Sequence, residues 1–169
     1  MLVVMAPGYL IDGYNLLHCF PALGQLLSRD VEAARDRLVR MLAAFRSGKR
    51  IRLTVVFDGR MPAGSPPADH ALGIKLLFAG PESADERIVR LVRRSRQPRS
   101  WTVVSSDRWV KENAGDYGAG TMSSERFVAL MQTTRKPARA PAEDKPEMVP
   151  QDVAYWEEYF RNRGREAGR

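Results

Sequence analysis

The sequence is poor in the residues that build several common kinds of site. It has one cysteine, Cys19, and two histidines, His18 and His70. A single cysteine forms no internal disulfide, which favours a reducing, cytoplasmic location. The histidines are not at a metal-ligand spacing, and Cys19 has no evident base beside it. These residues therefore predict neither a metal site nor a thiol nucleophile.

Long apolar runs and targeting segments are also missing. No run approaches the ~20 residues that a membrane helix needs, and the opening Met1–Pro7 lacks the basic start and the length of a secretory signal. There is no glycine-rich phosphate loop ending in Lys-Ser or Lys-Thr, and Ser105-Ser106 lacks the Gly-x-Ser-x-Gly elbow. We therefore expect no membrane association, no P-loop nucleotidase and no serine hydrolase.

What remains is the composition of a globular domain with excess positive charge. The 169 residues are 44% hydrophobic and 28% charged, which suits one domain with a sizeable core. The formal charge is +7, from 27 Lys and Arg against 20 Asp and Glu. Such a surplus favours a polyanionic partner, although a composition that is simply rich in arginine would give the same number.

Three apolar segments each lead into an aspartate. The segments are Tyr9–Ile11, Thr54–Phe57 and Thr102–Val104, and the aspartates that follow them are Asp12, Asp58 and Asp107. This is the pattern of buried parallel strands that deliver a polar side chain to their carboxyl ends. Because sites in open α/β sheets form at that edge, we expect the three carboxylates to lie at one rim.

The alternation of strands and helices predicts an α/β fold, with helices on both faces of a mostly parallel sheet. The expected strands are 9–11, 52–57, 73–78, 101–105 and 121–122. The expected helices are 30–46, 83–96, 108–113 and 124–134, and 15–26 is expected as one short helix or as a helix and a loop. We expect one globular domain over 1–135, a linker over 136–150 and a C-terminal helix and tail over 151–169. The aromatic side chains of that last helix need to be buried, either against its own domain or against a partner.

Asp85 joins the acidic rim if the helix that begins at Ser83 starts there. Ser83 and Glu86 have the spacing of a capping box. Crowded carboxylates repel one another, and a divalent cation such as Mg²⁺ or Mn²⁺ offsets the repulsion while preparing a water for attack on phosphorus. We therefore interpret Asp12, Asp85 and Asp107 as metal ligands. The alternatives are a turn aspartate at Asp58, a helix-dipole role for Asp85 and an N-cap at Asp107.

The same helix has a strongly basic outer face. Its arginines include Arg90, Arg93 and Arg94. This face predicts either an RNA-binding surface or a solvated one, and the sequence leaves both open.

With these residues laid out, the chain resembles the NYN-domain family of PIN-like nucleases, and within it the YacP-like branch. The resemblance rests on an ordered set of short motifs and covers about Tyr9 to Arg135. The motifs are Ile11-Asp12-Gly13-Tyr14-Asn15, Val56-Phe57-Asp58-Gly59, Ala84-Asp85-Glu86-Arg87-Ile88, Val104-Ser105-Ser106-Asp107-Arg108 and Gly118-Ala119 with Ser123-Ser124-Glu125.

The resemblance implies a PIN-like three-layer α/β/α fold and a metal-dependent endoribonuclease, with mRNA as substrate and the ribosome as an associated partner. It assigns the acidic site to Asp12, Asp58, Asp85 and Asp107, with Glu86 able to replace or assist Asp85. Asn15, Ser106 and Arg108 would support the rim and position the substrate. The alternative function is an RNA- or ribosome-binding module without catalysis, and divalent-metal binding by the rim separates the two. The number of metal ions and the oligomeric state stay open.

Overall fold

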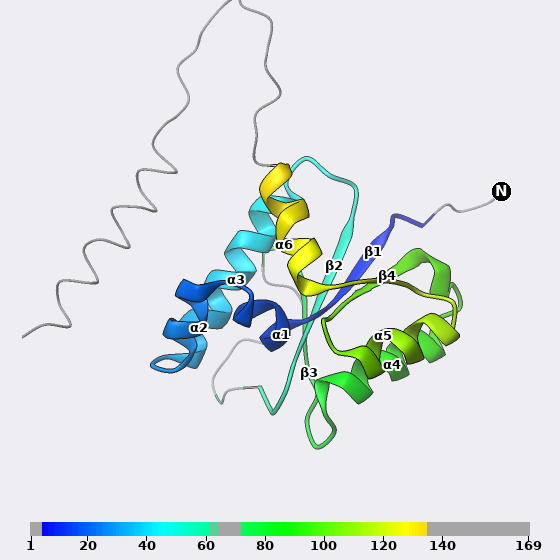
Figure 1. Cartoon of the computed structure of the whole chain (residues 1–169), viewed down its shortest axis with the longest axis horizontal. Helices are drawn as coiled ribbons and strands as arrows, with labels where there is room; N and C mark the ends of the chain where they lie inside the picture. Colours follow the sequence, from blue (N-terminus) through cyan, green and yellow to red (C-terminus); the bar gives the residue numbers. More distant parts are fainter. Residues whose placement is uncertain (1–4, 62, 64–71, 135–169) are drawn as a thin grey trace, which may run out of the picture. The chain divides into compact units, whose positions relative to one another are not determined.

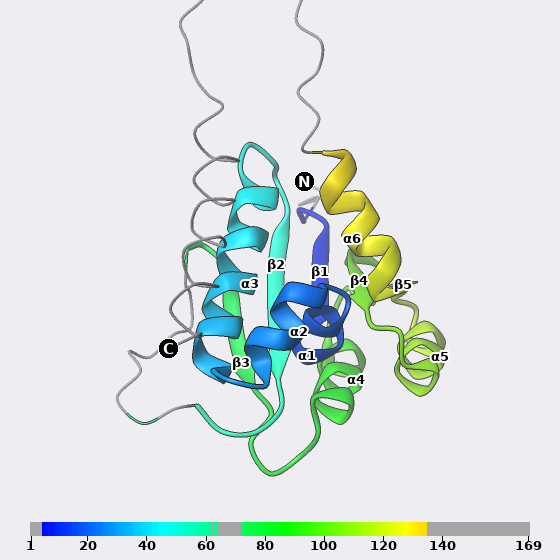
Figure 2. The same ribbon diagram turned by 60° about the vertical axis from the view of Figure 1, so that its left-hand side comes forward.

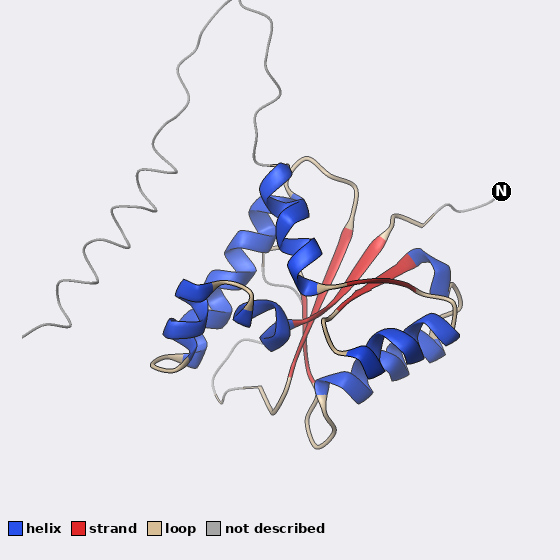
Figure 3. Cartoon of the chain, viewed as in Figure 1, coloured by secondary structure: helices blue, strands red, loops and turns tan. Residues whose placement is uncertain are grey.

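The computed structural model describes residues 5–61, 63 and 72–134, which form a three-layer α/β/α fold (Figures 1 and 3). The expected fold class is therefore confirmed. Five parallel strands make one sheet in the order β3-β2-β1-β4-β5. The strands are β1 Gly8–Asp12, β2 Arg52–Phe57, β3 Lys75–Phe78, β4 Trp101–Val104 and β5 Gly120–Met122. The α-helices are α1 Gly13–His18, α2 Pro21–Leu27, α3 Val31–Arg46, α4 Ala84–Arg94, α5 Arg108–Asp116 and α6 Ser124–Thr133, with a short 3-10 turn at Pro98–Ser100.

Helices cover both faces of the sheet, because successive strand residues point to opposite sides. Ile11 belongs to the larger core, which α1, α2, α3 and α6 close, while Leu10 belongs to a smaller core under α4 and α5. Both side chains are at most 2% exposed. Figure 2 shows α3 running along β2 and β3, with α4 on the other side of the sheet. The near-continuous apolar strands predicted from sequence follow from this double cover.

The helices begin where the sequence places capping residues. The Asp30 carboxylate accepts a hydrogen bond from the Ala33 amide and starts α3. Ser83 and Glu86 form both hydrogen bonds of the capping box at the start of α4. These caps fix where each helix meets the carboxyl end of the sheet.

Most boundaries lie within two residues of the expectation, and two differ by more. The segment over 15–26 is two helices, α1 and α2, because Pro21 opens a new helix at its first turn. Helix α5 continues to Asp116 instead of ending at Asn113. The linker and the C-terminal helix expected over 136–169 lie outside the described residues, and the expected domain boundary stays a prediction. Within the described part of the chain, no helix has the length and apolar character needed to cross a membrane.

Candidate functional site

Asp12 is the buried centre of the carboxyl end of the sheet. It is the last residue of β1 and the N-cap of α1, and its Oδ1 accepts a hydrogen bond from the Asn15 amide at 3.2 Å. The residue is only 6% exposed. The pKa of Asp12 is raised from 3.8 to about 7. Burial is the largest cause, the Asn15 amide lowers the pKa in part, and the charges of Asp85 and Asp58 raise it.

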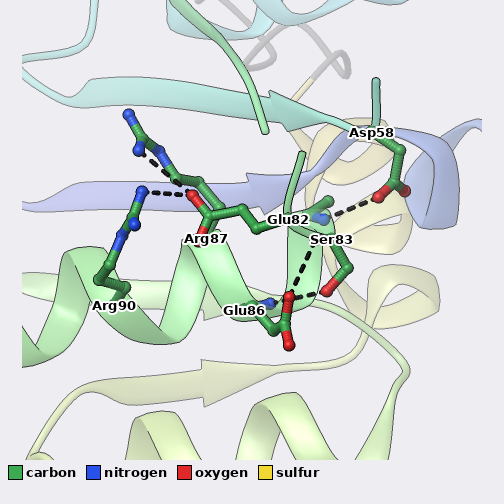
Figure 4. A network of polar contacts seen from close by, with 7 residues as sticks. Asp58, Glu82, Ser83, Glu86, Arg87 and Arg90 are labelled. Carbon is green, nitrogen blue, oxygen red and sulfur yellow. Dashed lines mark hydrogen bonds and ion pairs between the residues drawn. The ribbon is translucent and has the colours of Figure 1, made fainter. Parts of the chain in front are cut away.

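Asp85 and Asp58 approach Asp12 from the neighbouring elements. Asp85 lies in the first turn of α4, and its pKa is raised by partial burial and by the charge of Asp107. The interaction between the carboxyl groups of Asp12 and Asp85 raises the pKa of the first and lowers that of the second. Asp58 follows β2, and its Oδ1 accepts a hydrogen bond from the Ala84 amide at 2.7 Å, as Figure 4 shows. Asp58 therefore ties the start of α4 to the end of β2.

Glu86 has a different role from Asp85. Its Oε2 accepts a hydrogen bond from the Ser83 amide within the capping box, and its side chain is exposed. Of these two neighbouring acids, Asp85 is the one whose carboxylate interacts with Asp12.

Ser105 joins Asp12 to Asp107. Its side chain is fully buried, and its hydroxyl donates to Asp12 Oδ2 at 3.5 Å and accepts from the Asp107 amide at 3.1 Å. Asp107 is the N-cap of α5, where its Oδ1 accepts from the Val110 amide at 3.0 Å. The N-cap expected as an alternative role for Asp107 is present, and it does not move the residue away from the other acids, because Asp107 still acts on Asp85 electrostatically. Sequence reasoning did not single out Ser105.

Asn15 fastens three segments together. Its Oδ1 accepts hydrogen bonds from the Ser106 amide at 2.8 Å and from the Ser124 hydroxyl at 2.6 Å. The Ser106 hydroxyl donates to Glu125 Oε2 at 2.7 Å and accepts from the Ser124 amide. Asn15 and Ser106 therefore hold α1, the β4–α5 connection and the start of α6 at the same rim.

Glu125 is a further acid at this rim that the sequence did not assign to the site. The hydrogen bond from Ser106 lowers the pKa of Glu125, while burial and the Glu125 charge raise the pKa of the Cys19 thiol. A cavity of about 340 Å³ opens here, lined by Asn15, His18, Cys19, Ser106, Glu125 and Val128. The signal in the sequence was Ser123-Ser124-Glu125 after a short strand, the same pattern of strand and acid seen at Asp12.

The donor chemistry of the rim suits a hard divalent cation. Its acidic side chains offer carboxylate oxygens, which Mg²⁺ and Mn²⁺ prefer. Burial first, and then the charge of neighbouring acids, raises the pKa values of Asp12 and Asp85, and a bound cation would offset both effects. Over residues 5–61, 63 and 72–134, no group of three or more His, Cys, Asp or Glu side chains is arranged to hold a metal ion as it stands.

Two of the arginines expected to handle substrate form ion pairs. Arg108 is exposed and forms an i,i+4 ion pair with Glu112 at 2.6 Å on α5. Arg90 forms an ion pair with Glu82, which Arg87 also contacts at 3.3 Å, and Figure 4 shows both guanidinium groups reaching the same carboxylate. Arg93 and Arg94 are exposed in the last turn of α4, far along the helix from Asp85.

Three comparisons with known proteins agree with this architecture. The family model described as the YacP-like NYN domain matches residues 9–163. The curated "Uncharacterized protein YacP" of Bacillus subtilis (strain 168) is 35% identical over 83 residues, which are 48% of this chain and 49% of that protein. The aligned region thus spans about half the length of this relative.

Two crystal structures of Rae1 (YacP) from Bacillus subtilis share the fold at 28% identity. One of them, a tryptophan-to-leucine mutant, superposes with a TM-score of 0.62 over 75% of this chain and 76% of that one. The other superposes with a TM-score of 0.59 over 74% of this chain and 73% of that one.

The family match reaches residue 163, beyond the end at Arg135 expected from the motifs. The family's sequence pattern therefore includes the expected linker and terminal helix, which carried none of the recognised motifs. NYN domains form a PIN-like nuclease family. With a match over most of its length and the same fold, this chain belongs to the YacP-like NYN domain family.

Proposed function

We propose that this protein is a divalent-metal-dependent endoribonuclease that hydrolyses phosphodiester bonds of RNA at the Asp12 rim. The observation that carries the proposal is the electrostatic coupling of Asp12, Asp85, Asp58 and Asp107, four acids delivered by three strand ends and one helix start. Repulsion between crowded acids destabilises the metal-free fold. Their presence in a chain of net charge +7 therefore supports a functional role for them.

Asp12, Asp85 and Asp107 would hold the cation, and Asp58 would hold α4 in place through the Ala84 amide. When bound, Mg²⁺ or Mn²⁺ would neutralise charge on the scissile phosphate and lower the pKa of a bound water. Ser105 orients Asp12 Oδ2 and the Asp107 amide, so it acts as a positioning residue. Asn15 and Ser106 keep the three segments of the rim in register.

In the hydrolysis, the oxygen of water forms a bond to phosphorus and the bond to the leaving nucleoside oxygen breaks. The water proton passes to solvent or to a rim carboxylate, and the leaving oxygen takes up a proton. The protein's own contribution is to keep carboxylate oxygens fixed by backbone amides, so that no large rearrangement accompanies the reaction.

The second candidate function is an RNA- or ribosome-binding module without catalysis. It is favoured by one observation, that the acids within the described residues are not already gathered as a set of three ligands. Membership of a nuclease family and the raised pKa values of Asp12 and Asp85 support the enzymatic function instead.

The test is incubation of the purified protein with a long single-stranded RNA and, separately, with translating ribosomes, in Mn²⁺, Mg²⁺ or EDTA. We expect internal cleavage with a divalent cation and none in EDTA. Cleavage only on ribosomes would support mRNA in a cytoplasmic translation complex as the substrate. Calorimetric titration with Mn²⁺ gives an independent reading, and a protein that neither binds Mn²⁺ nor cleaves RNA in either setting contradicts the proposal.

A further inference from the structure

A second cavity lies at the opposite end of the sheet, where the strands begin. Its volume is about 600 Å³, and we call it the amino-end cleft. Arg52, Lys75 and Trp101 are the first residues of β2, β3 and β4, and all three line it. Arg46 and Arg94, the last residues of α3 and α4, complete its basic lining. Helices from both faces of the sheet thus bring cations to one opening.

Arg52 and Trp101 form a fixed platform across the middle strand. Both pair in register with Gly8 of β1, one from each side. The Arg52 guanidinium lies over the Trp101 ring at 4.2 Å from its centroid, and it also donates to the Ala6 carbonyl at 2.9 Å and to the Ser100 hydroxyl at 3.1 Å. A Cβ at Gly8 would come within 2.6 Å of the Trp101 ring and 3.2 Å of Arg52. The absence of a side chain at Gly8 is therefore what lets the platform form.

A second glycine makes room for Arg46. A Cβ at Gly73 would lie 2.5 Å from the Arg46 guanidinium, and the backbone there has φ +77, which disfavours other residues. Arg46 donates through Nε to the Ile51 carbonyl at 3.3 Å. Two arginines are thus held by backbone carbonyls and by space left at two glycines.

The positive charge of the cleft has no internal counter-charge among the residues that the structure describes. None of the residues lining the cleft is an Asp or Glu. The ion pairs between described side chains are Arg87–Glu82, Arg90–Glu82 and Arg108–Glu112, and they involve none of the four cations of the cleft. Arg46 and Arg94 suit the negative ends of α3 and α4, but Arg52 and Lys75 begin strands, where no helix dipole explains them.

We propose that the amino-end cleft binds the phosphodiester backbone of RNA as a site separate from the acidic rim. Fixed guanidinium groups suit phosphate oxygens, and the Trp101–Arg52 stack offers a flat edge for a sugar or base. Strand β1 is five residues long, so the cleft and Asp12 lie roughly 13 Å apart along it at about 3.3 Å per residue. The inference rests on the proposed function for the identity of the polymer, and it deepens that function by naming where RNA is anchored.

The amino-end cleft would offset the repulsion between the acidic rim and the RNA substrate. Carboxylates at the rim repel the phosphates of the substrate until a cation intervenes. A basic cleft a short distance away holds the same polymer through phosphates that are not cleaved. This arrangement separates affinity from chemistry, and it predicts RNA binding that needs no divalent metal.

The test is the double variant Lys75→Gln with Arg94→Gln, both exposed positions whose loss leaves the core untouched. Binding of a fluorescent 20-nucleotide single-stranded RNA is measured in EDTA across a salt series. We expect affinity about fivefold to tenfold lower at ~0.1 M salt. The slope of log affinity against log salt should fall by roughly 1.4, at 0.7 for each of two lost phosphate contacts.

The matched control is Arg29→Gln with Arg40→Gln, which removes the same charge from exposed positions around α3. If the control and the cleft variant weaken binding equally, only net charge matters and the cleft proposal is overturned. The same holds if the cleft variant binds like the wild type. Binding is measured in EDTA and so does not depend on cleavage. A wild-type protein that binds RNA through Lys75 and Arg94, yet neither binds Mn²⁺ nor cleaves RNA alone or on ribosomes, contradicts the proposed function and supports the cleft.

Discussion

The two ends of the sheet handle charge in opposite ways. At the carboxyl end, three aspartates each accept a hydrogen bond from a backbone amide: Asp12 from Asn15, Asp58 from Ala84 and Asp107 from Val110. At the amino end, Arg46 and Arg52 donate to backbone carbonyls instead. The acids interact with one another and Asp12 is buried, whereas Lys75 and Arg94 are exposed.

The direction of the chain explains this division. In a parallel sheet with crossover helices, helix N-termini meet the carboxyl ends of strands, and helix C-termini meet the amino ends. Each helix carries partial positive charge at its start and partial negative charge at its end. Acids are therefore favoured at one end of this sheet and cations at the other. The helix dipoles do not remove the repulsion between neighbouring acids. This repulsion adds to the effect of burial in raising the pKa of Asp12.

The strongest test of the comparison is Asp12→Asn. The amide oxygen can still accept from the Asn15 backbone, so the cap on α1 stays while the buried charge is lost. We expect RNA cleavage in Mn²⁺ to fall by at least about 100-fold, because removing a proposed direct ligand should cost more than the 10–100-fold typical of an outer residue. RNA binding in EDTA should stay within about twofold of the wild type. Undiminished cleavage by this variant would contradict a role for the rim in catalysis.

The same substitution should stabilise the metal-free protein at neutral pH. The folded protein keeps a proton on Asp12 up to about pH 7, whereas the unfolded chain releases it near 3.8. The free energy of unfolding therefore falls as pH rises from about 4 to 7, and the loss is complete above pH 7. At about 1.4 kcal/mol per pKa unit, Asp12→Asn should gain on the order of 1–4 kcal/mol at pH 8 and nothing at pH 4.

Thermal unfolding in EDTA at pH 4, 6 and 8 measures this difference. Asp36→Asn, on the exposed side of α3, controls for the change in net charge. A stability gain of Asp12→Asn that does not grow with pH would show that the Asp12 charge is not what destabilises the rim.

Ser105→Ala should have a smaller effect on cleavage. It removes the hydroxyl that links Asp12 to the Asp107 amide. We expect cleavage to fall about 10- to 100-fold, as for outer residues of metal sites, and stability to fall by about 1 kcal/mol. Loss of a hydrogen bond to the ionised form should also move the acidic limb of the pH–rate profile to higher pH. A uniform loss at every pH would indicate a structural role alone.

The positions of the rim acids in the sheet could be predicted because the evidence for them was local, whereas their role stays a prediction. Each of Asp12, Asp58 and Asp107 follows an apolar segment, and strand direction alone brings such positions to one edge. The capping box at Ser83 likewise predicted where α4 begins, and therefore the position of Asp85 in its first turn. Short-range patterns of this kind can be read from the sequence because they depend on neighbouring residues in the chain.

The sequence missed features that depend on contacts between distant segments. Ser105 is important because a buried hydroxyl meets Asp12, 93 positions away. Glu125 reaches Ser106 across the start of α6. The amino-end cleft draws on Gly8, Arg52 and Trp101 from three strands, and nothing in their local sequence marks them as partners. The sequence also did not predict the ion pair between Arg90 and Glu82, a residue that lies two positions before the start of α4.

The prediction with the smallest expected effect compares the contributions of the outer face of α4 and of the amino-end cleft to RNA binding. Glu82→Gln removes the carboxylate that holds Arg87 and Arg90, and it leaves both partly exposed guanidinium groups free to reach RNA. The stability cost should be below about 1 kcal/mol, because the pair is partly solvated. If the cleft is the main anchor, RNA affinity should rise less than about twofold and the salt slope should not change.

Glu32→Gln, in the exposed first turn of α3, makes the same change in net charge and is the control. If Glu82→Gln instead raises the salt slope by about 0.7 or more relative to that control, a freed arginine has gained a phosphate contact. The basic face that contains Arg90, Arg93 and Arg94 would then bind RNA as the sequence suggested. Positive charge would extend along α4 from the cleft towards Asp85, and the two ends of the sheet would be joined by one continuous RNA path.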